Sequence, residues 1–453
     1  MSRIVDQQRR GYEQQLRNAE GLFETDRAML LAPASTGQDV FNVKGAYYSW
    51  TPLTVPLEYT NWTEESAAHV EACYIGDWTS ISKIRVRGPE ALAFLARIGM
   101  NSLEKFALGQ IKHHVQLNEA GQIASEGVVY RVGEEEFIYT GGGGDWALWQ
   151  ATQGSWDMEI EAISPEMFIF EVQGPNSLFA LEKATGENLR DIRFNHSRMS
   201  QIGDIEVRVL RTGISGELGY ELHGSADDAG AVWAAAFEAG KEFGIRQLGM
   251  RSLLVQHIES GIATVGLDYF PASIVTPGAP KLLPRGTPTG SFIPQAVTDY
   301  FRMPGELGWG NRRARDGHDF VGREALEAQA ADGGPARKLA GLIWNEQDIT
   351  DLFAAQFRGG PLPDSMEMPR AIGAEFDQVL ANGRQVGISS SRTYSTVLRK
   401  MISLCVIDRD LMEVGTQLTV LWGRPGTPQR EIRATVAALP FKEDRRRTDV
   451  SAL

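Results

Sequence analysis

Two segments of the sequence repeat one pattern, in which a strand, a Gly-Pro corner and a helix follow each other: RGPEALAFL at 87–95 and QGPNSLFAL at 173–181. The residues before each corner, 83–88 and 168–174, alternate as in a strand, and those after it are apolar at helical spacing. Glycine permits a tight exit from the strand, and proline presets the φ angle of the first helical position. A duplicated strand–helix unit predicts two similar α+β halves packed together.

The composition is that of a globular chain. Because 453 residues are too many for one ordinary core, about two to four domains are expected. The net charge of −13 argues against a nucleic acid or an anionic membrane surface as a partner. The charged N-terminus lacks the apolar core of a signal peptide and no long apolar run occurs, so a cytoplasmic location without a membrane span is expected. Cys73 and Cys405 match no metal spacing, which predicts two buried thiols.

The chain is expected to have four parts. These are an N-terminal arm with the start of the first α+β domain (1–60), the duplicated α+β region (61–327), a Gly- and Pro-rich linker (328–336) and a C-terminal all-β domain (337–453). Between the repeated units, residues 113–140 predict a hairpin-like pair of strands. Residues 251–261 predict an amphipathic helix that ends at glycine.

A glycine-rich stretch, RTGISGELGYELHG at 211–224, leads into a strand. A phosphate-binding loop would place its glycines before a helix and add a lysine, so nucleotide binding is not expected. Within the strand, Tyr220 and Leu222 share one face and Glu221 points to the other. A carboxylate there is either solvated or buried against hydrogen-bond donors.

An ordered series of motifs resembles the folate-dependent aminomethyltransferase family, which comprises the T-protein of the glycine cleavage system and its relatives. The resemblance runs from about Asn61 to Phe441. Its motifs are DWTSI (77–81), VRGP (86–89), NEAGQIASEGVVY (118–130), VQGP (172–175), RTGISGELGYEL (211–222), LGMR (248–251), ESG (259–261), LGW (307–309), DFVGREAL (319–326), RKLAGL (337–342) and SRTYS (391–395). The resemblance implies a three-domain ring of the aminomethyltransferase type, in which two similar α+β halves and a C-terminal β-barrel surround tetrahydrofolate in a central hole.

Within this family, the sequence is most similar to tetrahydrofolate-dependent aryl ether O-demethylases. Two features carry that similarity: the eight-residue step from Arg251 to Glu259 and the extra residues between Gly266 and Asp299.

The resemblance also assigns roles to individual residues. Glu221 matches a glutamate that accepts hydrogen bonds from the pterin, which suits a carboxylate facing adjacent N–H donors. Arg251 matches an arginine that meets the glutamate tail of folate, with a surface salt bridge as the alternative. Tyr130 matches a folate-site tyrosine, with core packing as the alternative. Glu126 stands where the family has an aspartate near the reacting N5, from where it orients N5 or relays a proton to the leaving oxygen.

Other positions depart from the family pattern and point to the substrate pocket. Ser80 replaces a histidine, and Leu253 replaces a tyrosine that lies near the ether oxygen in vanillate-type relatives. His257, one turn along the same predicted helix, is a replacement proton donor or a histidine bonded within a domain contact.

A run of four glycines at 141–144 falls where vanillate-type relatives carry an arginine for the substrate carboxylate. Gly142 and Gly143 are therefore predicted to line a pocket enlarged by missing side chains, for a bulky and uncharged substrate; the alternative is a flexible loop without function. His113 and His114 point to opposite faces of a strand and do not share a metal ion, so no metal site is predicted.

These expectations together describe a tetrahydrofolate-dependent enzyme that moves a methyl or methylene group from a neutral aromatic ether to N5 of folate and releases a phenol or catechol. Glu126 and His257 are the candidate proton donors. A methoxy substrate would give 5-methyltetrahydrofolate and a methylenedioxyphenyl substrate, such as a lignan, methylenetetrahydrofolate. The alternatives are aminomethyl transfer or N-demethylation of an amine, and a folate-binding protein without turnover.

Overall fold

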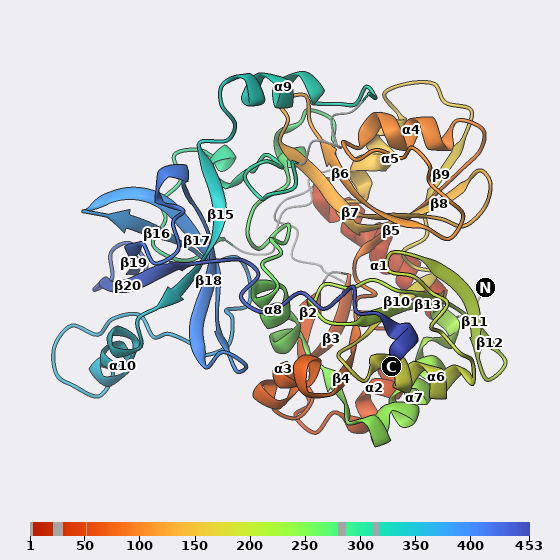
Figure 1. The fold of residues 1–453 in the computed structure, drawn as a ribbon, viewed down its shortest axis with the longest axis horizontal. Coiled ribbons are helices and arrows are strands. Elements are labelled where there is room, and N and C mark those ends of the chain that lie inside the picture. Colours follow the sequence, from red (N-terminus) through yellow and green to blue (C-terminus); the bar gives the residue numbers. More distant parts are fainter. Residues whose placement is uncertain (1–2, 21–29, 51, 280–286, 311–316) are drawn as a thin grey trace.

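The chain folds into several β-sheets and a closed β-barrel, with helices packed around them (Figure 1). The computed structural model describes residues 3–20, 30–50, 52–279, 287–310 and 317–453. Part of the inserted stretch between Gly266 and Asp299, residues 280–286, lies outside these described residues. Within them, no helix is both long and apolar enough to cross a membrane.

The first α+β half is a five-stranded antiparallel sheet. Its spatial order is β6 (Ile111–Leu117), β7 (Ile123–Arg131), β8 (Glu136–Gly142), β5 (Ser82–Arg87) and β9 (Glu159–Ala162), with helices α4 (Ala91–Ile98) and α5 (Asp145–Ala151). The strands at 113–140, expected to form a separate pair between the halves, are instead the body of this sheet, because β8 pairs directly with β5.

The second half repeats this order and adds one strand. Its sheet runs β11 (Ser197–Ile202), β12 (Ile205–Leu210), β13 (Gly219–Ser225), β10 (Met167–Gln173), β4 (Cys73–Asp77) and β14 (Ile245–Leu248), with helices α6 (Ser177–Thr185) and α7 (Ala229–Gly240). Thus β10 takes the place of β5 and β13 that of β8. Only β14 is parallel to its neighbour, β4. The predicted duplication is confirmed.

The repeated Gly-Pro corner differs in one detail from the expectation. Gly88 and Gly174 have φ angles of 129° and 122°, which side chains rarely adopt. The helices begin two residues after each proline, at Ala91 and Ser177. Proline therefore stiffens the turn before the helix and does not occupy the first helical position.

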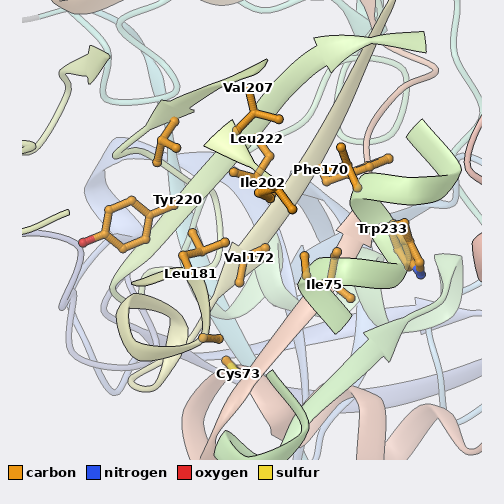
Figure 2. Packing of buried hydrophobic residues seen from close by; sticks show 14 of the residues in the cluster. Cys73, Ile75, Phe170, Val172, Leu181, Ile202, Val207, Tyr220, Leu222 and Trp233 are labelled. Carbon is orange, nitrogen blue, oxygen red and sulfur yellow. The ribbon is translucent and has the colours of Figure 1, made fainter. Parts of the chain in front are cut away.

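The core of the second half lies between its sheet and helices α6 and α7 (Figure 2). Tyr220 and Leu222 of β13 lie in this core together with Phe170, Val172 and Trp233, and all five are fully buried. The alternation predicted for this strand is confirmed, and Glu221 lies on the opposite face of the sheet.

The C-terminal domain is a closed six-stranded barrel, seen on the left of Figure 1. Its order is β15 (Arg337–Trp344), β18 (Lys400–Asp408), β17 (Arg384–Ser395), β16 (Phe376–Ala381), β19 (Gln417–Trp422) and β20 (Arg430–Ala437). The domain is not purely β, because helix α10 (Glu346–Ala355) follows β15. Helix α9 (Arg323–Ala331) also extends into the predicted linker.

The remaining elements join these domains. They are α1 (Arg3–Glu20), β1 (Leu30–Leu31), α2 (Ser35–Gln38), β2 (Ala46–Trp50), β3 (Leu53–Glu58), α3 (Trp62–Glu71) and α8 (Met250–Glu259). Helix α8 packs between α3 and strand β17 of the barrel, and its residues from Ser252 to Glu259 are all buried. The helix predicted at 251–261 is confirmed, but its predicted amphipathic character is wrong, since α8 has no continuous solvent face. Cys73 and Cys405 are buried free thiols, as predicted.

Candidate functional site

The second sheet carries a polar face that is turned away from its core. Glu221 of β13 lies directly opposite Glu171 of β10. The Tyr74 hydroxyl and the Gln173 amide donate hydrogen bonds of 3.0 and 2.7 Å to Oε2 of Glu171. Glu171 is 4% exposed, and the Glu221 side chain is 13% exposed. Burial, and next the charge of Glu221, raise the pKa of Glu171 well above its usual range.

The glycine-rich stretch before β13 wraps around the side chain of Gln173. A Cβ atom at Gly213 would lie 2.0 Å from the Gln173 amide nitrogen, and one at Gly219 would lie 2.7 Å from its Cγ. The amide oxygen of Gln173 accepts hydrogen bonds from the backbone N–H and the hydroxyl of Ser215. The glycines therefore leave room for an amide that ties the loop to the Glu171–Glu221 pair.

A histidine connects Glu221 to the first half of the molecule. Nε2 of His223 lies 2.8 Å from Oε2 of Glu221, and Nδ1 lies 2.9 Å from the hydroxyl of Tyr130 on β7. Burial lowers the pKa of His223, which favours the neutral ring. Neutral His223 then donates from Nε2 to Glu221 and accepts at Nδ1 from Tyr130.

Tyr130 and Glu221 are thus brought together, but Tyr130 is fully buried and reaches Glu221 through His223. Sequence reasoning missed His223. Its position two residues after Glu221 on a strand, hence on the same face, was the available signal.

Glu126 lies on β7, four residues before Tyr130, and pairs with a histidine of the neighbouring strand. Its Oε1 is 2.8 Å from Nε2 of His113, and the two side chains are 20% and 38% exposed. The His113 ring packs edge-on against Trp309, with 5.2 Å between ring centroids. From the sequence, His113 was weighed only as a metal ligand, together with His114. The structure makes it the partner of Glu126, and His114 points away to the carbonyl of Leu95.

His257 lies deeper, where α8 meets the barrel. Its Nε2 is 3.5 Å from Oδ2 of Asp268, and both side chains are almost fully buried. Asp268 also accepts hydrogen bonds from the Thr264 backbone and the Ser390 hydroxyl. Burial lowers the pKa of His257, which favours the neutral form. This geometry matches the alternative reading of His257, a histidine bonded within a domain contact.

The glycine run after β8 is packed closely against its neighbours. A Cβ atom would lie 2.4 Å from the Glu126 carbonyl at Gly141, 2.2 Å from Val265 at Gly142 and 2.7 Å from Ser82 at Gly144. Gly143 has a φ angle of 80°. At Gly141, Gly142 and Gly144 the predicted space left by missing side chains is absent, because neighbouring atoms fill it. A pocket role for Gly142 and Gly143 stays a prediction.

Of the other predicted residues, Arg251 and Leu253 lie on helix α8, and Ser80 follows strand β4. Arg251 pairs with Glu367 at 3.3 Å and Glu58 at 3.9 Å, as in the salt-bridge alternative. Leu253 is packed in an apolar cluster that includes Ile214 of the loop. The other aromatic and aliphatic members of this Leu253 cluster include Tyr48, Trp50, Trp78 and Leu267.

Ser80 donates a 2.8 Å hydrogen bond to the carbonyl of Trp50 and borders a small cavity beneath helix α1. Tyr12 of α1 closes that cavity with a 2.8 Å hydrogen bond to Asp145. The cavity lining comprises Gln8, Tyr12, Pro52, Leu53, Thr79, Ser80, Ser82, Asp145, Ser164 and Pro165.

Comparison with known proteins gives a consistent family. Residues 41–275 match the GCVT N-terminal domain, and residues 365–442 match the glycine cleavage T-protein C-terminal barrel domain. The chain is 37% identical to a sesamin methylene transferase of Sinomonas sp. (strain No.22), over 85% of this chain and 90% of the relative. It is 30% identical to a syringate O-demethylase of Sphingobium sp. (strain NBRC 103272 / SYK-6), with the same coverage.

A solved structure supports the same fold. The glycine cleavage system aminomethyltransferase T of Bartonella henselae aligns with a TM-score of 0.69 at 18% identity, covering 92% of this chain and 99% of that one. The predicted combination of α+β halves and a C-terminal barrel is therefore confirmed. With both domains matched in order, the chain belongs to the GCVT family of tetrahydrofolate-dependent one-carbon transferases.

Proposed function

We propose that the protein transfers a methyl or methylene group from a bulky, neutral aryl ether to tetrahydrofolate and releases a phenol or catechol. The names of two relatives, a sesamin methylene transferase and a syringate O-demethylase, support an aromatic ether as the substrate class. The observation that carries the proposal is the position of the Leu253 cluster. The glycine-rich loop at 211–218 contributes to this cluster and leads directly into β13, the strand of Glu221. Ile214 packs into that cluster, and the next residue, Ser215, bonds to Gln173 beside the carboxylate pair.

Glu221 and Arg251 suit the two ends of a folate. Glu221 is partly exposed, and within the described residues His223 is the sole hydrogen-bond partner of its side chain, so the carboxylate can accept further N–H donors. Arg251 is held by two carboxylates, one of them on the 60% exposed Glu367. A carboxylate of the folate tail would take the place of Glu367. Bound tetrahydrofolate supplies a nucleophilic nitrogen, N5, that accepts the one-carbon unit.

The Leu253 cluster suits a neutral aromatic ligand. The partly buried aromatic side chains of Tyr48 and Trp50 offer faces against which an aromatic ring can pack. The stretch from Tyr139 to Trp146 has no arginine or lysine to hold a substrate carboxylate. Both features favour a substrate without a carboxylate, such as a methylenedioxyphenyl lignan, over vanillate or syringate.

An aryloxide is a poor leaving group, so the ether oxygen needs a proton as its bond to carbon breaks. The Glu126–His113 pair suits this role better than His257. Both members of the pair are partly exposed, and His113 can replenish a proton on Glu126 from solvent. His257 is buried beside Asp268, and its neutral form is favoured.

The test incubates purified protein and tetrahydrofolate with vanillate, a neutral methoxyarene or sesamin, and follows folate and aromatic products by mass spectrometry. Methylenetetrahydrofolate with a catechol supports methylene transfer, and 5-methyltetrahydrofolate with a phenol supports O-demethylation. We expect Glu126→Gln to lower turnover at least about 100-fold while folate binding persists. If none of the ethers reacts and folate still binds, the aryl ether proposal is wrong, and N-methyl amines are the next substrates to assay.

A further inference from the structure

The Glu171–Glu221 pair brings two carboxyl groups to one side of the second sheet. Directly opposed residues of an antiparallel pair have Cβ atoms about 4.5–5.5 Å apart, so the two side chains are neighbours. Tyr74 and Gln173 donate hydrogen bonds to Glu171. His223 is hydrogen-bonded to Glu221. Neither carboxyl group forms a salt bridge with a lysine or arginine within the described residues.

The groups that donate hydrogen bonds to the pair are uncharged. Neutral His223 and the hydroxyls of Tyr74 and Tyr130 are uncharged donors. Of the nearby basic groups, Lys83 is fully buried, donates to the carbonyls of Thr79 and Ser164, and has its pKa lowered by burial to about 7. Arg208 of β12 lies opposite His223 and stays cationic, but in the part of the chain that the structure describes it forms no ion pair with either carboxylate. Two ionised carboxylates at this place would repel each other without a cation between them.

We propose that Glu171 and Glu221 share one proton and together carry a single negative charge, so that Glu171 is a positioning residue for the carboxylate that binds the pterin. The proposal rests on the proposed function only in assigning the pterin to Glu221. Glu221, the more exposed member, presents the charge, and the proton keeps buried Glu171 from repelling it. A single carboxylate matches the paired N–H donors of a neutral pterin edge.

The shared proton has a measurable consequence for folding. In the unfolded chain both glutamates ionise near pH 4.5, whereas the folded pair keeps one proton to higher pH. Above about pH 4.5 the folded state therefore binds more protons than the unfolded chain. The free energy of unfolding falls as pH rises, until the folded pair has lost its proton. Glutamine at position 171 removes the buried group that keeps the proton, whereas glutamine at position 221 removes only the neighbouring charge that helps to hold it.

The experiment measures urea unfolding of the wild type, Glu171→Gln and Glu221→Gln between pH 5 and 8. Glu206→Gln is the matched control, because Glu206 is an exposed glutamate of the neighbouring strand β12. We expect the ratio of unfolding constants between wild type and E171Q to grow by up to about tenfold per pH unit. The ratio for E221Q should grow less, because burial still raises the pKa of Glu171 in that variant. The ratio for E206Q should change less than about twofold over the whole range.

Ratios that stay constant with pH for both glutamine variants would overturn the shared proton. If E171Q does not fold, E221Q gives the comparison with a smaller pH dependence. Binding of 5-formyltetrahydrofolate separates this proposal from the proposed function. E171Q should bind it within about threefold of wild type at pH 7, and E221Q should bind it far more weakly. Wild-type binding by E221Q would refute the pterin assignment and leave the pH result to decide the shared proton.

Discussion

The two α+β halves have the same strand order but opposite chemistry at the same positions. In the first half, Arg85 of β5 lies opposite Ile138 of β8; in the second, Glu171 of β10 lies opposite Glu221 of β13. Arg85 is 31% exposed and pairs with Glu161 at 2.9 Å and with Glu136 at 3.3 Å. The duplicated fold fixes which positions face each other. The residue at each position decides whether it joins partly exposed ion pairs, as Arg85 does, or a buried polar pair, as Glu171 does.

The halves complement each other across their interface. The first half contributes Glu126 and Tyr130 from β7, and the second contributes the carboxylate pair and His223. The hydrogen bond between Tyr130 and His223 joins the two sets. In this account the second half holds the pterin, and the first half supplies the proton.

Removal of the Glu221 charge should give the largest effect. We expect E221Q to weaken binding of 5-formyltetrahydrofolate by about 2–3 kcal/mol, because a charge-assisted, two-pronged contact becomes a neutral one. Arg85→Gln, at the first-half counterpart of Glu171, should change binding by less than about twofold because it removes only a surface ion pair. Titration calorimetry measures both, and equal losses would contradict the assignment of folate to the second half.

Acid sensitivity should come more from the first half than from the second. Burial lowers the pKa of His114 on β6 to about 4. Burial also lowers the pKa of His223, but the neighbouring Glu221 raises it again in part. An unfolded histidine takes up a proton below pH 6.5, so wild-type stability should fall by about 2 kcal/mol per such histidine between pH 6.5 and 5. Urea unfolding of His114→Gln should lack most of this loss, and an unchanged loss would show that His114 is not its source.

The sequence could predict features that depend on residues close together in the chain, but not contacts between distant segments. Periodicity and the Gly-Pro corners predicted the duplication and the core face of Tyr220 and Leu222, because both depend on near neighbours in the chain. Glu171 was missed because its pairing with Glu221 depends on the register of two strands separated by β11, β12 and the glycine-rich loop. The glycines at 141–144 were misread for a similar reason, since the atoms that fill their space, such as those of Val265, come from distant segments.

Loss of the hydrogen bond between Tyr130 and His223 should have a smaller effect than loss of the Glu221 charge or protonation of His114. Tyr130→Phe removes the hydroxyl that meets Nδ1 of His223 and leaves that buried nitrogen without its partner. We expect a loss of about 1–2 kcal/mol in the free energy of unfolding and a several-fold weaker affinity for folate. Tyr139→Phe, which breaks a 2.7 Å contact with Ser125 inside the first half, should destabilise the fold similarly but leave folate binding unchanged. Equal effects on binding would show that Tyr130 does not act through Glu221.

The smallest effect is expected at the exposed end of the site. Glu367→Gln removes one partner of Arg251 and should change stability by less than about 0.5 kcal/mol, because Glu367 is 60% exposed. Its effect on folate should be a slight gain, up to about threefold in affinity, as Arg251 is freed for the tail of the ligand. A weaker affinity in E367Q would place the tail elsewhere.

An experimental structure of the protein with bound 5-formyltetrahydrofolate tests the division between the halves most directly. The account predicts that the pterin N–H groups lie within hydrogen-bond distance of Glu221, with Glu171 behind it and His223 still bonded to Tyr130. A pterin bound elsewhere, with Glu221 contacting His223 but no ligand atom, would contradict it.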